Sequence, residues 1–271
     1  MKMNTIGFNA KNEEYTTDTQ LATTGEVKAP RQSVVQVYFP HRGTGWSYYN
    51  DSFDLKVGDY VYVEGKLEGY RGQVTEVNYS FKIKLSDYKR VIAVADTTVK
   101  GDLYPAGSHF VGFDRSTIPF SKVVTWFRPP EKDEDYVTSN DSSKSFLLAD
   151  LLGSGYFDGL AAEGKNYYLD YDVEYLELDG TRGRAIVDGR EYYVVEFDYN
   201  DGEVSNLKCQ CFAGGACKHE FVALYKLKET LDYIDQNHSD KYKGYFAAID
   251  KHSLWDTAMK KKASGKITLE V

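Results

Sequence analysis

Cysteine is scarce in this chain of 271 residues, and its three cysteines all fall between positions 209 and 217. With no cysteine elsewhere, the disulfide framework that staples many small secreted domains is excluded. No apolar run approaches the roughly 20 residues needed to cross a bilayer, and the first residues contain no apolar signal core. We therefore expect a cytoplasmic protein with no membrane segment.

Familiar catalytic and cofactor-binding motifs are also missing. The chain has no glycine-rich loop ending in Lys-Ser or Lys-Thr, no dinucleotide fingerprint and no Gly-X-Ser-X-Gly elbow. Outside the cysteine segment, the histidines lie in unrelated contexts, at His41, His109, His238 and His252. The sequence therefore predicts a protein that is not an enzyme and has no small-molecule substrate.

An excess of basic residues is lacking as well, and the formal net charge is -8. The charge is uneven: it is +2 over residues 1–128, -12 over residues 129–202 and +2 over residues 203–271. The acidic middle segment favours a basic protein partner, whereas the two ends can still approach a polyanion. Neither end is strongly basic, so we expect modest affinity for bare phosphate backbone.

Composition divides the chain into four segments. Residues 1–31 hold few large apolar residues, which indicates a poorly ordered arm, and residues 32–128 show the two-residue alternation of short strands. Residues 129–144 contain two prolines, a charge run and a serine cluster, which are typical of a linker. Residues 145–271 combine further strands with helical spacing. The predicted fold class is α+β and β-rich, in two domains.

Local patterns predict individual elements. The apolar group at 146–152 indicates a short helix, and 81–85 is consistent with a strand. Apolar residues recur at helical spacing in the segment that begins at His219, so one face of that helix should be buried. An acidic stripe on strand spacing is interpreted as the solvated face of a sheet, and its members are Asp170, Asp172, Glu174 and Glu177.

The cysteine segment has the pattern of a metal site. A Cys-X-Cys pair, a five-residue loop and a Cys-X-His pair supply three thiolates and one imidazole, a complete set for tetrahedral zinc: Cys209, Cys211, Cys217 and His219. Four protein ligands close the coordination shell, so we predict one structural zinc ion. The alternatives are free thiols or a labile disulfide, and a catalytic zinc with Glu220 as its base.

The run CQCFAGGACKH resembles the SWIM zinc finger, in which Cys-X-Cys, a loop and Cys-X-His follow one another. The resemblance covers about residues 185–235, with a hairpin before the ligands and a helix after them. SWIM modules are associated with DNA binding and with protein–protein contacts, so the resemblance implies one of these roles. The five-residue loop is at the short end of the family's range and leaves little room for recognition by the loop itself.

Residues 33–95 resemble a second group of domains. The run LKVGDYVYVEGKLEGYRGQVTEV spaces its glycines so that short, twisted strands can turn tightly, which is the construction of an SH3-like barrel. It is similar to KOW segments and, with the preceding VVQVYFPHRGTGWSYYN, to the N-terminal DNA-binding domain of PriA helicases and the PSP1 family. This resemblance implies a small β-barrel that binds DNA.

Aromatic and basic residues in these segments are candidates for contacting nucleic acid. Aromatic faces can stack on bases while a cation meets phosphate. With 23 tyrosines in the chain, each aromatic residue has the alternative of being part of a tyrosine-rich core or rim. The candidates are Arg42, Trp46, Tyr48, Tyr70, Arg71 and Lys218.

Together, these patterns predict a non-enzymatic zinc-binding protein. It would bind nucleic acid, DNA more than RNA, through a composite of the N-terminal β domain and the SWIM module. The rival interpretation is an adaptor whose zinc finger binds another protein.

Overall fold

The computed structural model describes residues 3–8, 30–131, 137, 144–157, 160, 173–213, 215–258 and 265–270. The chain divides into two compact units. Unit 1 comprises Met1–Phe8, Thr98–Val123 and Lys132–Val271, and unit 2 comprises Asn9–Thr97 and Val124–Glu131. The division falls inside helix α1 (Phe120–Phe127), so it differs from the expected boundary at residue 128.

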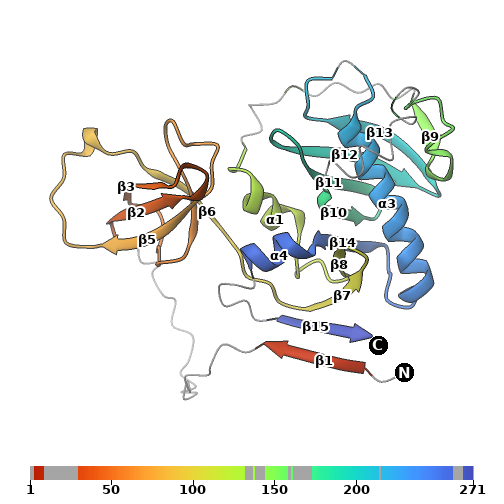
Figure 1. Cartoon of the computed structure of the whole chain (residues 1–271), viewed down its shortest axis with the longest axis horizontal. Coiled ribbons are helices and arrows are strands. Elements are labelled where there is room, and N and C mark those ends of the chain that lie inside the picture. The colour runs from red at the N-terminus through yellow and green to blue at the C-terminus, as the bar shows by residue number, and fades with distance from the viewer. Residues whose placement is uncertain are drawn as a thin grey trace, which may run out of the picture. The chain divides into compact units, whose positions relative to one another are not determined.

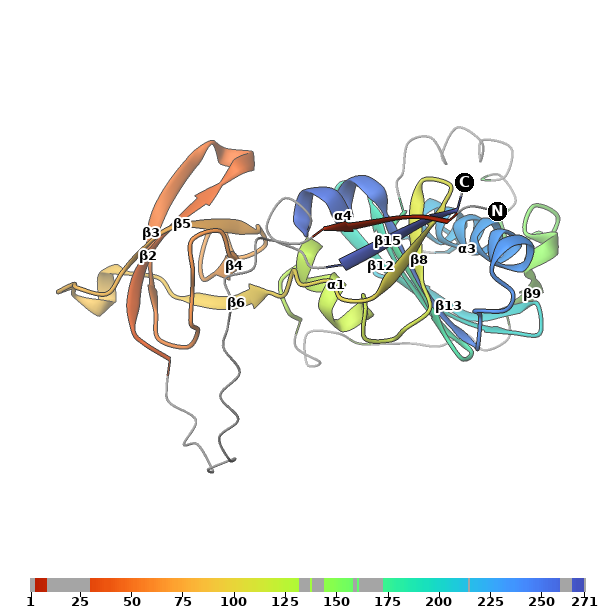
Figure 2. The same ribbon diagram turned by 90° about the horizontal axis from the view of Figure 1, so that it is seen from below.

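Unit 2 is built on a five-stranded antiparallel sheet with the order β3-β2-β5-β4-β6 (Figure 2). Side chains alternate along a strand, so Val35, Val37 and Phe39 of β2 are buried while Tyr38 between them is exposed. A short 3-10 helix at Pro40–Arg42 leads into β3. The strands are β2 (Ser33–Phe39), β3 (Thr44–Asn50), β4 (Tyr60–Val63), β5 (Gly72–Asn78) and β6 (Val91–Ala95).

The expectation of a closed barrel in unit 2 is wrong, because the five strands form an open sheet. Its edge strands β3 and β6 approach at an isolated bridge between Tyr49 and Arg90. This single bridge forms no ladder between β3 and β6, so the two edges of the sheet are not joined. The segment 81–85 is not a strand either: it runs as a loop into a 3-10 helix at Leu85–Asp87.

Unit 1 contains a ten-stranded sheet with the order β1-β15-β7-β8-β14-β10-β11-β12-β13-β9 (Figure 1). Neighbouring strands are antiparallel except for β15 and β7, which are parallel. The strands are β1 (Met3–Phe8), β7 (Asp102–Ala106), β8 (His109–Gly112), β9 (Ser145–Leu147), β10 (Val173–Asp179), β11 (Arg182–Asp188), β12 (Tyr192–Asn200), β13 (Glu203–Cys209), β14 (Tyr245–Asp250) and β15 (Gly265–Glu270).

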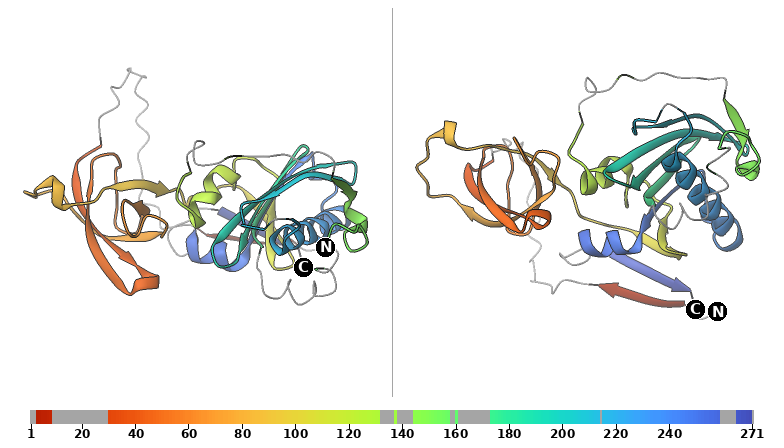
Figure 3. Two further views of the ribbon diagram at one scale, coloured as in Figure 1. Left: turned by 90° about the horizontal axis from the view of Figure 1, so that it is seen from above. Right: turned by 45° about the horizontal axis from the view of Figure 1, so that its top comes forward.

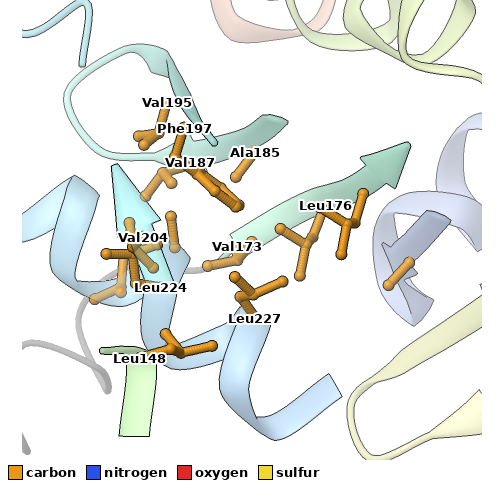
Figure 4. Close-up of a cluster of buried hydrophobic side chains, with 14 of the residues drawn as sticks. Leu148, Val173, Leu176, Ala185, Val187, Val195, Phe197, Val204, Leu224 and Leu227 are labelled. Carbon is orange, nitrogen blue, oxygen red and sulfur yellow. The ribbon is translucent and has the colours of Figure 1, made fainter. Parts of the chain in front are cut away.

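Helix α3 (Lys218–Asn237) packs along one face of this sheet, next to β10, β11, β12 and β13 (Figures 1 and 3). The helix predicted from its apolar spacing is confirmed, because Phe221, Leu224 and Leu227 are all buried. Their neighbours in the core include Leu176 and Val195 (Figure 4). Each such side chain contributes about 1.5–3 kcal/mol by leaving water. The sheet and helix together confirm the α+β class, and helix α4 (Lys251–Thr257) follows β14.

The two described members of the acidic stripe do not lie on a solvated face. Glu174 and Glu177 are both buried, whereas Asp170 and Asp172 lie outside the described residues. Glu177 accepts hydrogen bonds from Arg184 at 2.5 Å, from the Tyr175 hydroxyl at 2.7 Å and from a backbone N–H of α1 at 2.8 Å. This carboxylate is therefore a structural acceptor inside unit 1.

Several expected segment boundaries differ from the structure. Residues 3–8 of the expected arm form β1 and pair with β15, while residues 9–29 lie outside the described residues. The helix expected at 146–152 is instead strand β9 followed by a 3-10 helix at Leu148–Asp150. Strands β7 and β8 fall within the expected domain 32–128, but they belong to the sheet of unit 1. Most of the expected linker 129–144 lies outside the described residues.

Candidate metal centre

The four expected ligands meet where strand β13 ends and helix α3 begins. Cys209 is the last residue of β13 and Cys211 follows two positions later. Cys217 is the N-cap of α3, and His219 lies in the first turn of the helix. The hairpin of β12 and β13 turns at Asp201 and Gly202, which both have positive φ as a tight two-residue turn requires.

The ligand atoms are close enough to share one ion. One ligating atom from each of Cys209, Cys211, Cys217 and His219 lies within 4.8 Å of the others. His219 Nδ1 is 3.8 Å from Cys209 Sγ and 3.9 Å from Cys217 Sγ. Around a tetrahedral zinc ion, sulfur and nitrogen ligands lie about 3.6 Å apart and two sulfurs about 3.8 Å apart. The group therefore fits a single tetrahedral metal ion with small adjustments.

Backbone N–H groups prepare the sulfurs to carry negative charge. Cys211 N–H donates to Cys209 Sγ at 3.4 Å, and Glu220 N–H donates to Cys217 Sγ at 3.4 Å. The Glu220 carboxylate in turn accepts from Cys217 N–H at 3.0 Å, which completes a capping box at the start of α3. The N-terminal end of the helix dipole adds to this stabilisation of a thiolate.

A stacked ring and a glycine fix the orientation of the imidazole. The His219 ring lies 4.3 Å, centroid to centroid, from the Tyr193 ring at an interplanar angle of 27°. A Cβ placed on Gly189 would lie 3.1 Å from His219 Nε2 and 3.1 Å from a Tyr193 ring carbon. Gly189 therefore leaves the space in which the imidazole turns Nδ1 toward the sulfurs.

Protonation equilibria at the centre favour a bound cation. A hydrogen bond to the Cys209 sulfur, and then burial, raise the pKa of the Cys217 thiol, and burial raises the pKa of Cys211. Three sulfurs this close cannot all be thiolates without a neighbouring positive charge. Burial lowers the pKa of His219 to about 4, so its imidazole is neutral near neutral pH and carries a lone pair that a metal ion can accept. A bound divalent ion would supply this charge.

Glu220, the base considered for a catalytic metal, is occupied in the cap. Its carboxylate is buried and accepts the Cys217 N–H, and burial raises its pKa. With three sulfurs and one imidazole around one point, the shell has the composition of a structural site.

The candidates for nucleic-acid contact separate into exposed and engaged residues. Trp46 and Tyr70 are 44% and 45% exposed, and Arg42 beside them is exposed. Tyr48 is only 6% exposed, so its expected role on the surface is wrong. Its position on the inner face of the sheet, packed at 6.1 Å against Phe39, explains the burial.

The remaining two candidates are less accessible. The Arg71 guanidinium donates to the backbone carbonyl of Trp126 and lies 4.3 Å from the centre of the Tyr60 ring. Lys218 is half-buried as the first residue of α3, between two metal ligands. Arg71 is thus committed to contacts inside unit 2.

Sequence reasoning missed four residues of functional interest. His41 stacks on Tyr70 with ring centroids 4.0 Å apart. Tyr193 and Gly189 support His219 from the neighbouring hairpin, and Phe212 projects fully exposed from the loop between the ligands. Phe212 had a signal in the sequence, because an aromatic residue beside a metal ligand in a glycine-rich loop has few neighbours to cover it.

No protein-family model, curated protein or solved structure matches the chain. Among the described residues, no helix combines the length and apolar composition that crossing a membrane requires. Fold and site together define a β-rich α+β protein that carries a Cys3His group able to hold one metal ion.

Proposed function

We propose that Cys209, Cys211, Cys217 and His219 bind one structural zinc ion in a SWIM-type module. The observation that carries the proposal is the closed group of three sulfurs and Nδ1 within 4.8 Å at the junction of β13 and α3. Soft thiolate ligands with one imidazole favour zinc over magnesium or calcium. The hairpin before the ligands and the helix after them support the SWIM assignment over residues 185–235.

The zinc ion stabilises its module and performs no chemistry on a substrate. A four-ligand shell leaves no position for water, and Glu220 is held by the helix cap. The protein is on this basis a binding protein and not an enzyme.

Nucleic acid, DNA more than RNA, is the proposed ligand. The support comes from unit 2, where Trp46 and Tyr70 are exposed rings and the Arg42 guanidinium lies 6.0 Å from the centre of the Tyr70 ring. Exposed aromatic rings beside arginine are the contacts that bind bases and phosphates without reading sequence.

A protein adaptor is the second candidate function, and Phe212 favours it. This ring is fully exposed on a short loop whose two ends are metal ligands, so presenting it to a partner costs little conformational entropy. An exposed aromatic on a rigid loop is the kind of residue that becomes a hot spot in a protein interface.

The zinc site and the nucleic-acid ligand are tested separately, the first by zinc content and the second by binding. Native mass spectrometry should find about one zinc ion per chain, in line with a single four-ligand site, and Cys217→Ser should lose it. Stoichiometric zinc in a triple Cys→Ser variant would disprove the site. Binding of the zinc-loaded chain to DNA and RNA is then measured by fluorescence anisotropy across a salt series. Absence of any salt-sensitive binding at low ionic strength would leave the adaptor as the better interpretation.

A further inference from the structure

Unit 2 gathers three aromatic rings and one arginine at one end of its sheet. We call this group the aromatic cap, and its members are His41, Arg42, Trp46 and Tyr70. Two of its rings pack against the fully buried ring of Phe39, whose centroid is 6.1 Å from His41 and 6.2 Å from Trp46. His41 stacks on Tyr70 at 4.0 Å with an interplanar angle of 20°. The exposed rings are thus extensions of the core and not isolated surface side chains.

Backbone features hold the aromatic cap in place. Trp46 is paired with Val37 in the register of β2 and β3, which fixes it above the core. Gly43 has a φ of +63° and its N–H donates to the Phe39 carbonyl at 3.0 Å, which closes the turn that carries His41 and Arg42. The backbone that carries these side chains is therefore fixed before a ligand binds, which lowers the entropy lost on binding.

The net charge of the segment that forms the sheet of unit 2 is low for duplex recognition. Residues 30–97 contain nine Lys or Arg and eight Asp or Glu. Some of these cations are already engaged, since Arg90 pairs with Asp51 and Arg71 bonds to a backbone carbonyl. Duplex binding depends on neutralising many phosphates, whereas a single strand can also be held by stacking on its exposed bases.

We propose that the aromatic cap binds single-stranded nucleic acid, with Trp46 and Tyr70 stacking on unpaired bases and Arg42 meeting a phosphate. This inference rests on the proposed nucleic-acid function and specifies its ligand. Bases in a duplex are already stacked on one another, so these ring faces have no partner there. The Arg42 guanidinium carbon lies over the Tyr70 ring, 6.0 Å from its centre, so a cation is already present where a nucleotide would meet this ring.

The test compares one strand with its duplex on the full-length, zinc-loaded protein. Fluorescence anisotropy is measured with an oligothymidylate of about 12 nucleotides, within the range of single-strand sites, and with the same strand paired to oligodeoxyadenylate. The single strand should bind more tightly. Its affinity should fall with salt with a logarithmic slope of about -0.7 to -1.4, since one or two phosphates are neutralised.

Matched variants locate the site. Trp46→Ala and Tyr70→Ala should each weaken single-strand binding about 5- to 150-fold, the range for losing one stacked base. Tyr79→Ala is the control, because Tyr79 is 41% exposed in the same unit but lies outside the aromatic cap: it follows the last residue of β5, whereas Tyr70 precedes the first. It should bind like the parent protein. Unchanged thermal midpoints show that the variants keep their fold.

The outcomes separate this inference from the function on which it rests. Tighter binding of the duplex, with a steep salt slope, overturns the single-strand inference and leaves nucleic-acid binding standing. Equal losses from Tyr79→Ala and Trp46→Ala overturn the location at the aromatic cap. Failure of the parent protein to bind either probe at low salt overturns both.

Discussion

The two units present their candidate functions in different ways. Unit 1 has a group of ligands whose chemistry alone defines the site, and a core in which α3 covers a wide sheet. Unit 2 has a smaller core made from strands, and its candidate surface is defined by which aromatic rings remain exposed. The difference shows that a metal site depends on residue type and spacing, whereas an aromatic surface depends on the burial of each ring.

Loss of the metal gives the largest expected effect and should act on unit 1 alone. Cys217→Ser removes one ligand but keeps a good N-cap, since serine is favoured at this position. Structural zinc sites contribute about 10–16 kcal/mol of apparent binding free energy, so we expect a fall of several kcal/mol in the free energy of unfolding of unit 1. The two clusters of core residues share no member, so unit 2 should keep its stability.

Fluorine NMR can follow both units in one sample. The chain has three tryptophans: Trp46 and Trp126 belong to unit 2, and Trp255 belongs to unit 1. With 5-fluorotryptophan incorporated, Cys217→Ser should lower the urea midpoint of the Trp255 resonance only. His252→Gln is the control, because that side chain is exposed in unit 1 away from the ligand set. A parallel shift of all three resonances would show that the units unfold together.

The metal centre could be predicted because its signal is local. Cys209 to His219 spans one strand end, one loop and one helix start, so spacing alone brings the four side chains together. The aromatic cap could be predicted only in part. Trp46 and Tyr48 are alternate residues of one strand and share its inner face, yet Trp46 lies near the end of β3 and stays exposed while Tyr48 is covered.

Strand pairing across long sequence distances was beyond sequence reasoning. Nothing local in the sequence shows that β8 pairs with β14, which lies far along the chain at Tyr245–Asp250. The same holds for Glu177, whose strand spacing suggested water on one side. Its partners Arg184 and the backbone of α1 come from other parts of the chain and bury it.

Displacing the His219 ring should have a smaller effect on metal binding than Cys217→Ser. It tests the metal centre of unit 1 without replacing a ligand. Gly189→Val adds a branched side chain where a Cβ already lies 3.1 Å from His219 Nε2, so the ring must move away from the sulfurs. Loss of such a supporting contact lowers metal affinity by roughly 10- to 100-fold. Competition with a chromophoric zinc chelator measures the change.

The control for this substitution lies in the ligand loop itself. A Cβ on Gly215 would meet no atom within 4 Å, so Gly215→Ala should bind zinc like the parent protein. If the two variants lost equal affinity, the loop's flexibility and not the space beside His219 would limit the site. Neither change should alter nucleic-acid binding at the aromatic cap.

Mild acid gives the smallest expected effect on stability. The contribution of His109 to this effect should belong to unit 1. His109 is buried in unit 1, where burial and the charges of Lys226 and Lys251 lower its pKa to about 3, against 6.5 in an unfolded chain. Its Nε2 lies 2.5 Å from the Val173 carbonyl, so this nitrogen carries the proton of the neutral ring. His41 in unit 2 is exposed, and burial followed by Arg42 lowers its pKa without enclosing the ring.

The direction in which stability changes with pH follows from whether the folded or the unfolded chain binds the proton on His109. Between the two pKa values of His109 the unfolded chain is protonated and the folded chain is not, so stability present above pH 6.5 is lost as the pH falls. From about pH 7 to about pH 6 this amounts to about 0.7 kcal/mol. His109→Gln, whose amide can still donate to Val173, should remove that part of the pH dependence from the Trp255 transition. An equal slope in the parent protein and the variant would assign the acid sensitivity of unit 1 to other groups. Because the pKa of His41 is also lowered, the Trp46 transition has a slope of its own, and only a change of that slope in His109→Gln would show that the units share the effect.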